Sequence, residues 1–216
     1  MAPSSGYVVI MNELRKKIQG VILAGGRSRR FGSDKAAVII ADSDSRTLLQ
    51  RICDELKSLQ LDVVVVTHAD ATLKPDGFTV LRDLVPDSGP LGGIVTAMTL
   101  VPADAYLVVT CDMPFVTRDL LAQLVAAFQQ TGMASVFESN FVLQPFPALL
   151  TSACLCAANL LIAERRLDMS GFLAQISQLH KVSRVDNGTD FMNMNTLDDL
   201  RQVRQHLPTQ QPKEKE

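Results

Sequence analysis

The sequence contains no long hydrophobic run. Although 47% of its 216 residues are apolar, no stretch approaches the roughly 20 residues that a helix needs to span a bilayer. The apolar stretch near the start, YVVIM (7–11), is too short for the core of a signal peptide, and basic residues follow it instead of preceding it. We therefore expect a cytoplasmic protein that has no membrane partner.

Positive charge is not in excess either. Lys and Arg number 21 against 23 Asp and Glu, which gives a formal net charge of −2. Proteins that bind nucleic acids usually carry a basic face, so we expect no nucleic-acid partner. An anionic ligand would have to be captured by a local cluster of basic residues, because the overall field does not attract it.

Cysteine is scarce, with only Cys53, Cys111, Cys154 and Cys156 in the chain. No two of them form a C-x-x-C pair, and no Cys/His cluster has the spacing of a zinc site. We interpret all four as buried, reduced thiols of a cytosolic protein.

Strand-like apolar runs alternate with helical patterns along the chain. We expect strands at 20–24, 62–67, 77–83, 105–112 and 181–186, and helices at 47–60, 91–101, 117–130, 151–166 and 196–207. The segments 134–139 and 142–150 are ambiguous, and two prolines in the second favour an edge strand or a connecting segment. This alternation predicts a three-layer α/β/α fold with a mostly parallel twisted sheet. We expect one domain at 19–207, an N-terminal extension at 1–18 and a disordered tail at 208–216.

A glycine-arginine loop, AGGRSRRFGSDK (24–35), follows the first expected strand. Gly25 and Gly26 allow backbone amides to approach a ligand closely, and Arg27, Arg29, Arg30 and Lys35 add positive charge. Such a loop suits a di- or triphosphate, although neither a P-loop nor a dinucleotide-binding fingerprint is present. From the residues alone, a solvated basic turn explains the same pattern equally well.

Two further groups of unusual residues follow other expected strands. In DLVPDSGPLGGI (83–94), Asp83 is placed to accept hydrogen bonds from a nucleoside, and Gly92 and Gly93 leave room for a flat ring. In VVTCDMPFV (108–116), Asp112 ends a strand where one carboxylate and substrate phosphates can hold Mg²⁺. The alternatives are a glycine-rich helix start and a turn or capping aspartate. Ligands of parallel sheets bind beyond the carboxyl ends of the strands, where all three groups lie.

Residues 23–36, LAGGRSRRFGSDKA, closely resemble the signature LAGGxSxRMGxDKA of nucleotidyltransferases similar to molybdenum cofactor guanylyltransferase. The segments DLVPDSGPLGGI, CDMP (111–114) and FMNMNTLDDL (191–200) are similar to further motifs of that family, and the likeness extends over about 19–206. It implies a Rossmann-like fold of the nucleotide-diphospho-sugar transferase type. The chain departs from the family at Phe31, in 37–51, and at Thr67 and His68, where an asparagine is common.

The resemblance also implies an activity, which is Mg²⁺-dependent transfer of GMP from GTP to molybdopterin with release of pyrophosphate. It places Arg27, Arg30, Lys35 and Asp112 in catalysis, Asp112 and Asn195 on the metal, and Gln144 and Asn193 at the acceptor. It implies that the nucleotide contacts the following residues: Leu23, Ala24, Gly25, Gly26, Lys35, Thr67, Asp83, Gly89, Pro90, Leu91, Gly92 and Asp112. Further partners implied are molybdenum-insertion and molybdoenzyme-delivery proteins.

The expected chemistry needs no general base, because an acceptor phosphate is already mostly ionised at neutral pH. This agrees with the scattered positions of His68, His180 and His206, to which we assign no catalytic role. Two alternatives stay open. The enzyme uses CTP or a small phosphorylated metabolite instead, or the chain is a non-catalytic GTP-binding protein that delivers the cofactor.

Overall fold

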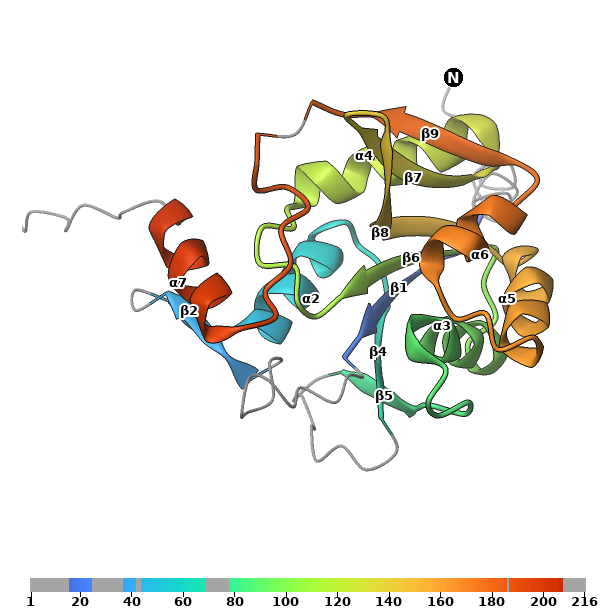
Figure 1. The fold of residues 1–216 in the computed structure, drawn as a ribbon, viewed down its shortest axis with the longest axis horizontal. Coiled ribbons are helices and arrows are strands. Elements are labelled where there is room, and N and C mark those ends of the chain that lie inside the picture. Colours follow the sequence, from blue (N-terminus) through green and yellow to red (C-terminus); the bar gives the residue numbers. More distant parts are fainter. Residues whose placement is uncertain (1–15, 25–36, 42–43, 69–77, 186, 208–216) are drawn as a thin grey trace, which may run out of the picture.

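A seven-stranded sheet forms the centre of the computed structural model, which describes residues 16–24, 37–41, 44–68, 78–185 and 187–207. The strands lie in the order β5-β4-β1-β6-β8-β7-β9 (Figure 1). Their bounds are β1 Ile18–Leu23, β4 Val63–Thr67, β5 Thr79–Arg82, β6 Ala105–Thr110, β7 Ala134–Ser139, β8 Val142–Thr151 and β9 Leu179–Ser183. The sheet is mostly parallel, as predicted, and only β8 runs against its neighbours.

Helices cover both faces of the sheet, so the predicted three-layer architecture is confirmed (Figure 1). On one face, α2 (Leu48–Ser58) and α4 (Arg118–Thr131) pack with α7 (Leu197–His206), and on the other face lie α3 (Gly89–Leu100), α5 (Cys154–Ala163) and α6 (Met169–Gln175). The central strands β1, β4 and β6 read as nearly continuous apolar runs because both of their faces are buried.

Helices α4 and α7 begin at capping residues that the sequence displays. The Thr117 side chain accepts a hydrogen bond from the Leu120 amide at the start of α4, and Thr196 does the same for Asp199 at the start of α7. Both caps agree with the expected helix starts. The short helix α6, which Asp168 caps, was not expected.

The expectation that 142–150 forms an edge strand or a connecting segment is wrong. Strand β8 lies inside the sheet and pairs with β6 and with β7. Its two prolines, Pro145 and Pro147, fall in an irregularity where the pairing with β7 jumps from Ala148 to Gln144. A proline lacks the N–H that a ladder requires, and here the ladder is interrupted at that point.

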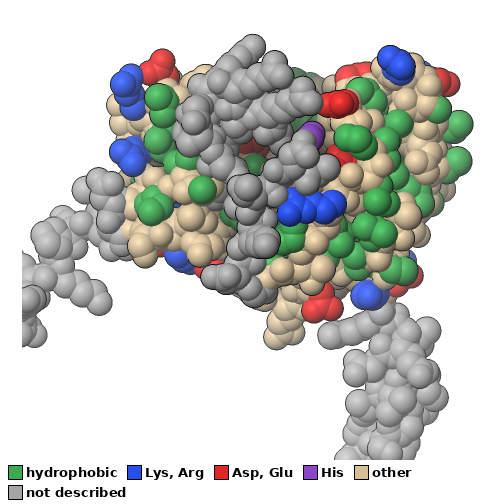
Figure 2. Space-filling view, turned by 90° about the horizontal axis from the view of Figure 1, so that it is seen from below, with side chains coloured by type: hydrophobic (Ala, Val, Ile, Leu, Met, Phe, Trp, Pro, Cys, Tyr) green, Lys and Arg blue, Asp and Glu red, His purple; other side chains and the backbone are tan. Residues whose placement is uncertain are grey.

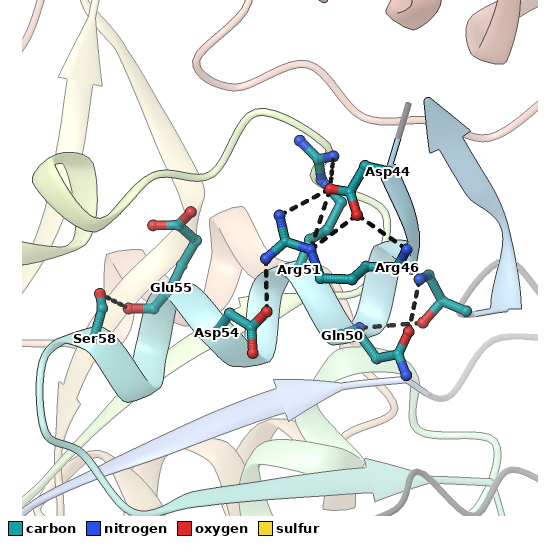
Figure 3. Close-up of polar contacts among 8 residues, drawn as sticks. Asp44, Arg46, Gln50, Arg51, Asp54, Glu55 and Ser58 are labelled. Carbon is teal, nitrogen blue, oxygen red and sulfur yellow. Dashed lines mark hydrogen bonds and ion pairs between the residues drawn. The ribbon is translucent and has the colours of Figure 1, made fainter. Parts of the chain in front are cut away.

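A small hairpin of β2 (Ile39–Ala41) and β3 (Asp44–Thr47) forms a second sheet that was not expected. The Asp44 carboxylate joins it to α2 by accepting from Arg51 Nη1 at 2.8 Å, and it also accepts from Arg46 Nη2 of its own strand at 2.8 Å (Figure 3). The hairpin also contacts α7, where Arg204 Nη2 donates to the Ile39 carbonyl at 3.4 Å. This hairpin follows directly on the segment that carries the glycine-arginine loop.

The cysteines are only partly as expected. Cys53 and Cys154 are buried, Cys111 is half-buried, and Cys156 is exposed on α5. Burial raises the pKa of the Cys53 thiol to about 12, and it also raises the pKa of Cys154. Within the described ranges, none of the helices combines the length and the apolarity that crossing a membrane requires.

Candidate active site

The carboxyl ends of four parallel strands meet along one edge of the sheet. Backbone hydrogen bonds join them just where the strands end, from Ala24 N to Val66 O at 2.8 Å, from Cys111 N to Leu23 O at 3.0 Å, and from Asp83 N to Thr67 O at 2.9 Å. The segments that leave β1, β4, β5 and β6 therefore start side by side. This is the edge at which parallel α/β sheets bind ligands.

The glycine-arginine loop starts at this edge. The amide of its first residue, Ala24, donates a hydrogen bond to β4. The carbonyl of the preceding Leu23 accepts one from Cys111, the residue before Asp112. Gly25, Gly26, Arg27, Arg29, Arg30 and Lys35 lie outside the described residues. Their roles stay predictions.

Asp112 lies two residues beyond β6 and is held from both sides. Met113 beside it is buried in the core, and the Asp112 carbonyl accepts a hydrogen bond from the Met194 amide at 2.8 Å. The carboxylate oxygen Oδ1 is buried and has no hydrogen-bond partner among the described residues. A buried carboxylate oxygen of this kind is costly unless a cation, a water or a ligand group satisfies it.

Asn193 and Asn195 come to this place on the segment that joins β9 to α7. Met194 between them is fully buried, and its bond to Asp112 brings the two flanking asparagines, both exposed, to the carboxyl edge. Asp199 in the first turn of α7 fixes the segment, because its Oδ2 accepts from Asn195 N at 2.7 Å and from Thr196 N at 2.8 Å. Figure 1 shows this segment crossing from β9 to α7.

These donors fit a magnesium ion. Among the described residues no three His, Cys, Asp or Glu side chains gather into a metal-binding group. Mg²⁺ is usually held by one or two carboxylates together with water and substrate phosphates, so a single aspartate with a neighbouring amide oxygen suits it.

Asp83 is tied into the turn that leads to α3. Its Oδ1 accepts from Thr96 Oγ1 at 3.0 Å and from the Val85 amide at 2.9 Å, and the Leu84 amide donates to the same Thr96 hydroxyl at 2.9 Å. The turn is thus bonded to a fully buried threonine of α3. Sequence reasoning missed Thr96, because nothing in an apolar helix marks one threonine as the partner of a turn 13 residues earlier.

Gly92 and Gly93 have a packing role. A Cβ on Gly92 would lie 2.5 Å from the Val85 carbonyl oxygen, and one on Gly93 would lie 2.8 Å from Leu23 Cδ2. They allow α3 to approach both the turn and β1. Gly89 has a positive φ of 56°, Pro90 is half-buried and Leu91 is buried. A contact of Gly89, Pro90, Leu91 or Gly92 with a base stays a prediction.

Thr67 lies at the edge but is fully buried. Its hydroxyl accepts a hydrogen bond from Arg82 Nη1 at 3.1 Å, and the same nitrogen donates to the His68 carbonyl at 3.2 Å. Arg82 is an exposed basic residue at the end of β5 that sequence reasoning did not consider. A contact between Thr67 and the nucleotide stays a prediction.

Gln144 is half-buried near the start of β8, opposite Phe137 of β7. Because β8 is antiparallel to β6, the start of β8 lies at the carboxyl edge. The edge thus has two halves on either side of Asp112, with Asp83 and Thr67 on one side and Gln144 on the other.

This architecture, a mostly parallel sheet with an aspartate just beyond a central strand, is that of a nucleotidyltransferase. The solved structure of molybdopterin-guanine dinucleotide biosynthesis protein A from Archaeoglobus fulgidus has the same fold. It superposes with a TM-score of 0.72 at 21% identity, covering 87% of this chain and 97% of that one.

The chain belongs to the family of MobA-like NTP transferase domains, whose model matches residues 20–181. It is 33% identical over 209 residues to a probable molybdenum cofactor guanylyltransferase of Chloroflexus aggregans, covering 89% of this chain and 96% of that protein. It is also 33% identical over 196 residues to a molybdenum cofactor guanylyltransferase of Shewanella frigidimarina, with 87% and 95% covered. The family expected from residues 23–36 is therefore confirmed.

Proposed function

We propose that this protein transfers GMP from GTP to molybdopterin, forming the guanine dinucleotide of the molybdenum cofactor and releasing pyrophosphate. The names of its relatives support the substrates, and the arrangement around Asp112 supports the reaction. The single observation that carries the proposal is the buried Oδ1 of Asp112 at the end of β6, with the segment 193–195 hydrogen-bonded to the same residue.

In the proposed reaction an oxygen of the acceptor phosphate forms a bond to the α-phosphorus of GTP, and the bond from that phosphorus to the β-phosphate oxygen breaks. Asp112 and Asn195 would hold Mg²⁺, which when bound neutralises charge on the α-phosphate. Arg27, Arg30 and Lys35 hold the β- and γ-phosphates and stabilise the leaving pyrophosphate. Gln144 and Asn193 orient the acceptor on the other side of Asp112.

The main barrier is the approach of one anion to another, so positioning and electrostatics supply the acceleration. The acceptor phosphate needs no deprotonation near neutral pH. No proton has to pass through a histidine, so the reaction needs no catalytic role for His68, His180 or His206.

The test is the Asp112→Ala variant, assayed for GTP-dependent pyrophosphate release in the presence of molybdopterin and magnesium. We expect turnover to fall about 100-fold or more, because a group that offsets charge in the transition state is worth several kcal/mol. The matched control is Asp119→Ala on α4, whose carboxylate side chain is 90% exposed. Unchanged turnover in Asp112→Ala, with the fold intact by circular dichroism, would refute the assignment.

Substrate choice is tested separately by giving the wild-type protein each of the four nucleoside triphosphates with purified molybdopterin. We expect pyrophosphate release with GTP and a product with the mass of the guanine dinucleotide. Release with CTP in place of GTP would instead make the protein a cytidylyltransferase. Binding of GTP without turnover would support the delivery protein.

A further inference from the structure

An ion pair joins the end of strand β9 to the segment that carries Asn193 and Asn195. Arg184 Nε donates to Asp190 Oδ2 at 2.6 Å, a short distance that charge-assisted hydrogen bonds favour. The Asp190 side chain is only 11% exposed, and that of Arg184 is 26% exposed. A carboxylate withdrawn so far from water is costly unless a cation pairs with it, so the pair determines where Asp190 can lie.

This pair differs from the ion pairs at the surface. Arg201 and Asp198 on α7, for example, form a pair whose side chains are 77% and 80% exposed. Charged side chains of both signs also lie scattered over the face shown in Figure 2. Exposed pairs contribute little to stability. A pair withdrawn from water gains little net stability either, since its desolvation offsets the attraction, so stability alone does not account for Arg184 and Asp190.

The Arg184 end of the pair is anchored to the sheet. Its amide donates to the Glu138 carbonyl of β7 at 3.0 Å, which continues the parallel pairing of β7 and β9 beyond Ser183. The carboxyl ends of β7 and β9 lie at the same edge of the sheet as that of β6, because β8 runs against both β6 and β7. Arg184 is therefore a fixed point at the edge that carries Asp112.

From Asp190 the chain passes directly into contacts with the sheet. Phe191 packs against Phe137 of β7, with ring centroids 5.4 Å apart. The Met192 amide donates to the Thr189 carbonyl at 3.0 Å and closes a turn. These contacts carry the position of Asp190 on to the residues that follow it.

The segment 187–195 is thus held at two points. The ion pair fixes Asp190, and the hydrogen bond from Met194 N to Asp112 O fixes the second point at 2.8 Å. Asn193 lies between these points and Asn195 directly after the second, and both are exposed. Figure 1 shows the segment crossing from β9 to α7. A group that orients a substrate must be placed precisely, so the loss of one of two anchors should be felt in the reaction.

We propose that the ion pair of Arg184 and Asp190 positions the acceptor for the transfer reaction. It does so through the segment 187–195, by fixing where the two asparagines lie. This inference rests on the proposed guanylyltransferase reaction. The nucleotide would contact β4 and the turn before α3 on the other side of Asp112, so the ion pair should act on the acceptor and hardly on GTP.

The test compares Arg184→Gln with the wild type in steady-state pyrophosphate release, with molybdopterin and GTP varied in turn at saturating magnesium. We expect kcat/KM for molybdopterin to fall about 10-fold or more, because a small displacement of an orienting group is enough for such a loss, while KM for GTP changes less than about twofold. The matched control is Lys181→Gln. It removes the ion pair from Lys181 Nζ of the same strand to Glu138 Oε1 at 3.0 Å and should leave both constants unchanged.

A second measurement does not depend on activity. Hydrogen exchange followed by mass spectrometry reports on the Met192 and Met194 amides in peptides that cover 187–196. We expect exchange about 10-fold faster in Arg184→Gln, because a segment released at one end opens more easily. Arg184→Lys keeps the positive charge and should recover most of kcat/KM and of the protection from exchange. If Arg184→Gln fails to fold by circular dichroism, Asp190→Asn takes its place.

Three results would overturn the proposal even if the wild type transfers GMP. The first is a variant with the wild-type kcat/KM for molybdopterin, and the second is an equal loss for both substrates, which general damage to the fold would cause. The third is unchanged exchange over 187–196. A wild-type chain that transfers no GMP would instead refute the guanylyltransferase reaction together with the positioning role, so the two failures can be told apart.

Discussion

Gly92 shows how closely the backbone of α3 approaches the turn that precedes it. A methyl group at Gly92 would come too close to the Val85 carbonyl oxygen and would also crowd both carboxylate oxygens of Asp83. At Gly93 the nearest atom is instead the terminal methyl group of Leu23. A backbone carbonyl cannot rotate away as a side-chain methyl can, so the two neighbouring glycines are expected to respond differently to substitution.

We predict that Gly92→Ala lowers the free energy of unfolding by about 1–3 kcal/mol, as overpacking usually does. Gly93→Ala should cost clearly less and serves as the matched control, because both substitutions gain similarly in helix propensity. Urea unfolding followed by circular dichroism measures both. A Gly92→Ala variant as stable as the wild type would show that the turn 83–88 can move away from α3.

Asp112 and the glycine pair Gly92 and Gly93 show what can and cannot be predicted from the sequence at the residue scale. The position of Asp112 at the end of a buried strand could be predicted, because a continuous apolar run indicates a buried strand and an acidic residue follows it directly. The glycines were interpreted as space for a ring, and the structure adds a packing role. That role depends on Val85 and Leu23, which only the folded chain brings into contact with them.

At the scale of elements, charge fixes strand β3 of the hairpin, whereas Ile40 of β2 is buried in the core. Hydrogen bonds and ion pairs from Arg46 and Arg51 lower the pKa of Asp44 from 3.8 to about 2 (Figure 3). A carboxyl group with a lower pKa in the folded state stabilises the fold fully above its unfolded pKa, and this contribution is lost as the pH falls through the folded pKa. The window for Asp44 therefore lies between about pH 4 and pH 2.

We predict that Asp44→Asn is less stable than the wild type at pH 7 and that this difference shrinks as the pH falls from about 4 to 2. The effect should be modest, because the ion pairs lie at the surface. Urea midpoints of both proteins at several pH values measure it, and Asp119→Asn provides a carboxylate that is almost fully exposed for comparison. A difference that is independent of pH would mean that the ion pairs do not hold the hairpin.

The elements that could be predicted are those whose pattern is set by burial. Strands β1, β4 and β6 and helices α2, α4 and α7 show apolar runs or capped amphipathic patterns. The hairpin β2–β3 could not be predicted, since DSRT carries no apolar alternation and is held by ion pairs with α2. The central place of β8 was missed because prolines usually indicate an edge, and only the pairing register shows that they fall in an irregularity.

At the scale of the whole molecule, one sheet is shared by two cores. Cys53 belongs to the core under α2 and α4, and Cys154 belongs to the core under α3 and α5. The strands between them contribute alternate side chains to both cores, as Val21 and Ile22 of β1 do. Neither helical layer can therefore unfold without exposing one face of the sheet, so the two layers are expected to unfold together.

The two buried thiols can report on this cooperativity. We predict that the exposed Cys156 reacts rapidly with a thiol reagent in native buffer, whereas the buried Cys53 and Cys154 do not. Both are buried and have raised pKa values, and only the thiolate is reactive. In increasing urea Cys53 and Cys154 should become reactive at the same concentration, and this concentration should coincide with the loss of helical circular dichroism. As a control, Cys156→Ser should remove only the rapid phase of labelling. Labelling of Cys154 at a lower urea concentration than Cys53 would show instead that the α3–α5 layer separates from the sheet while the α2–α4 layer stays folded.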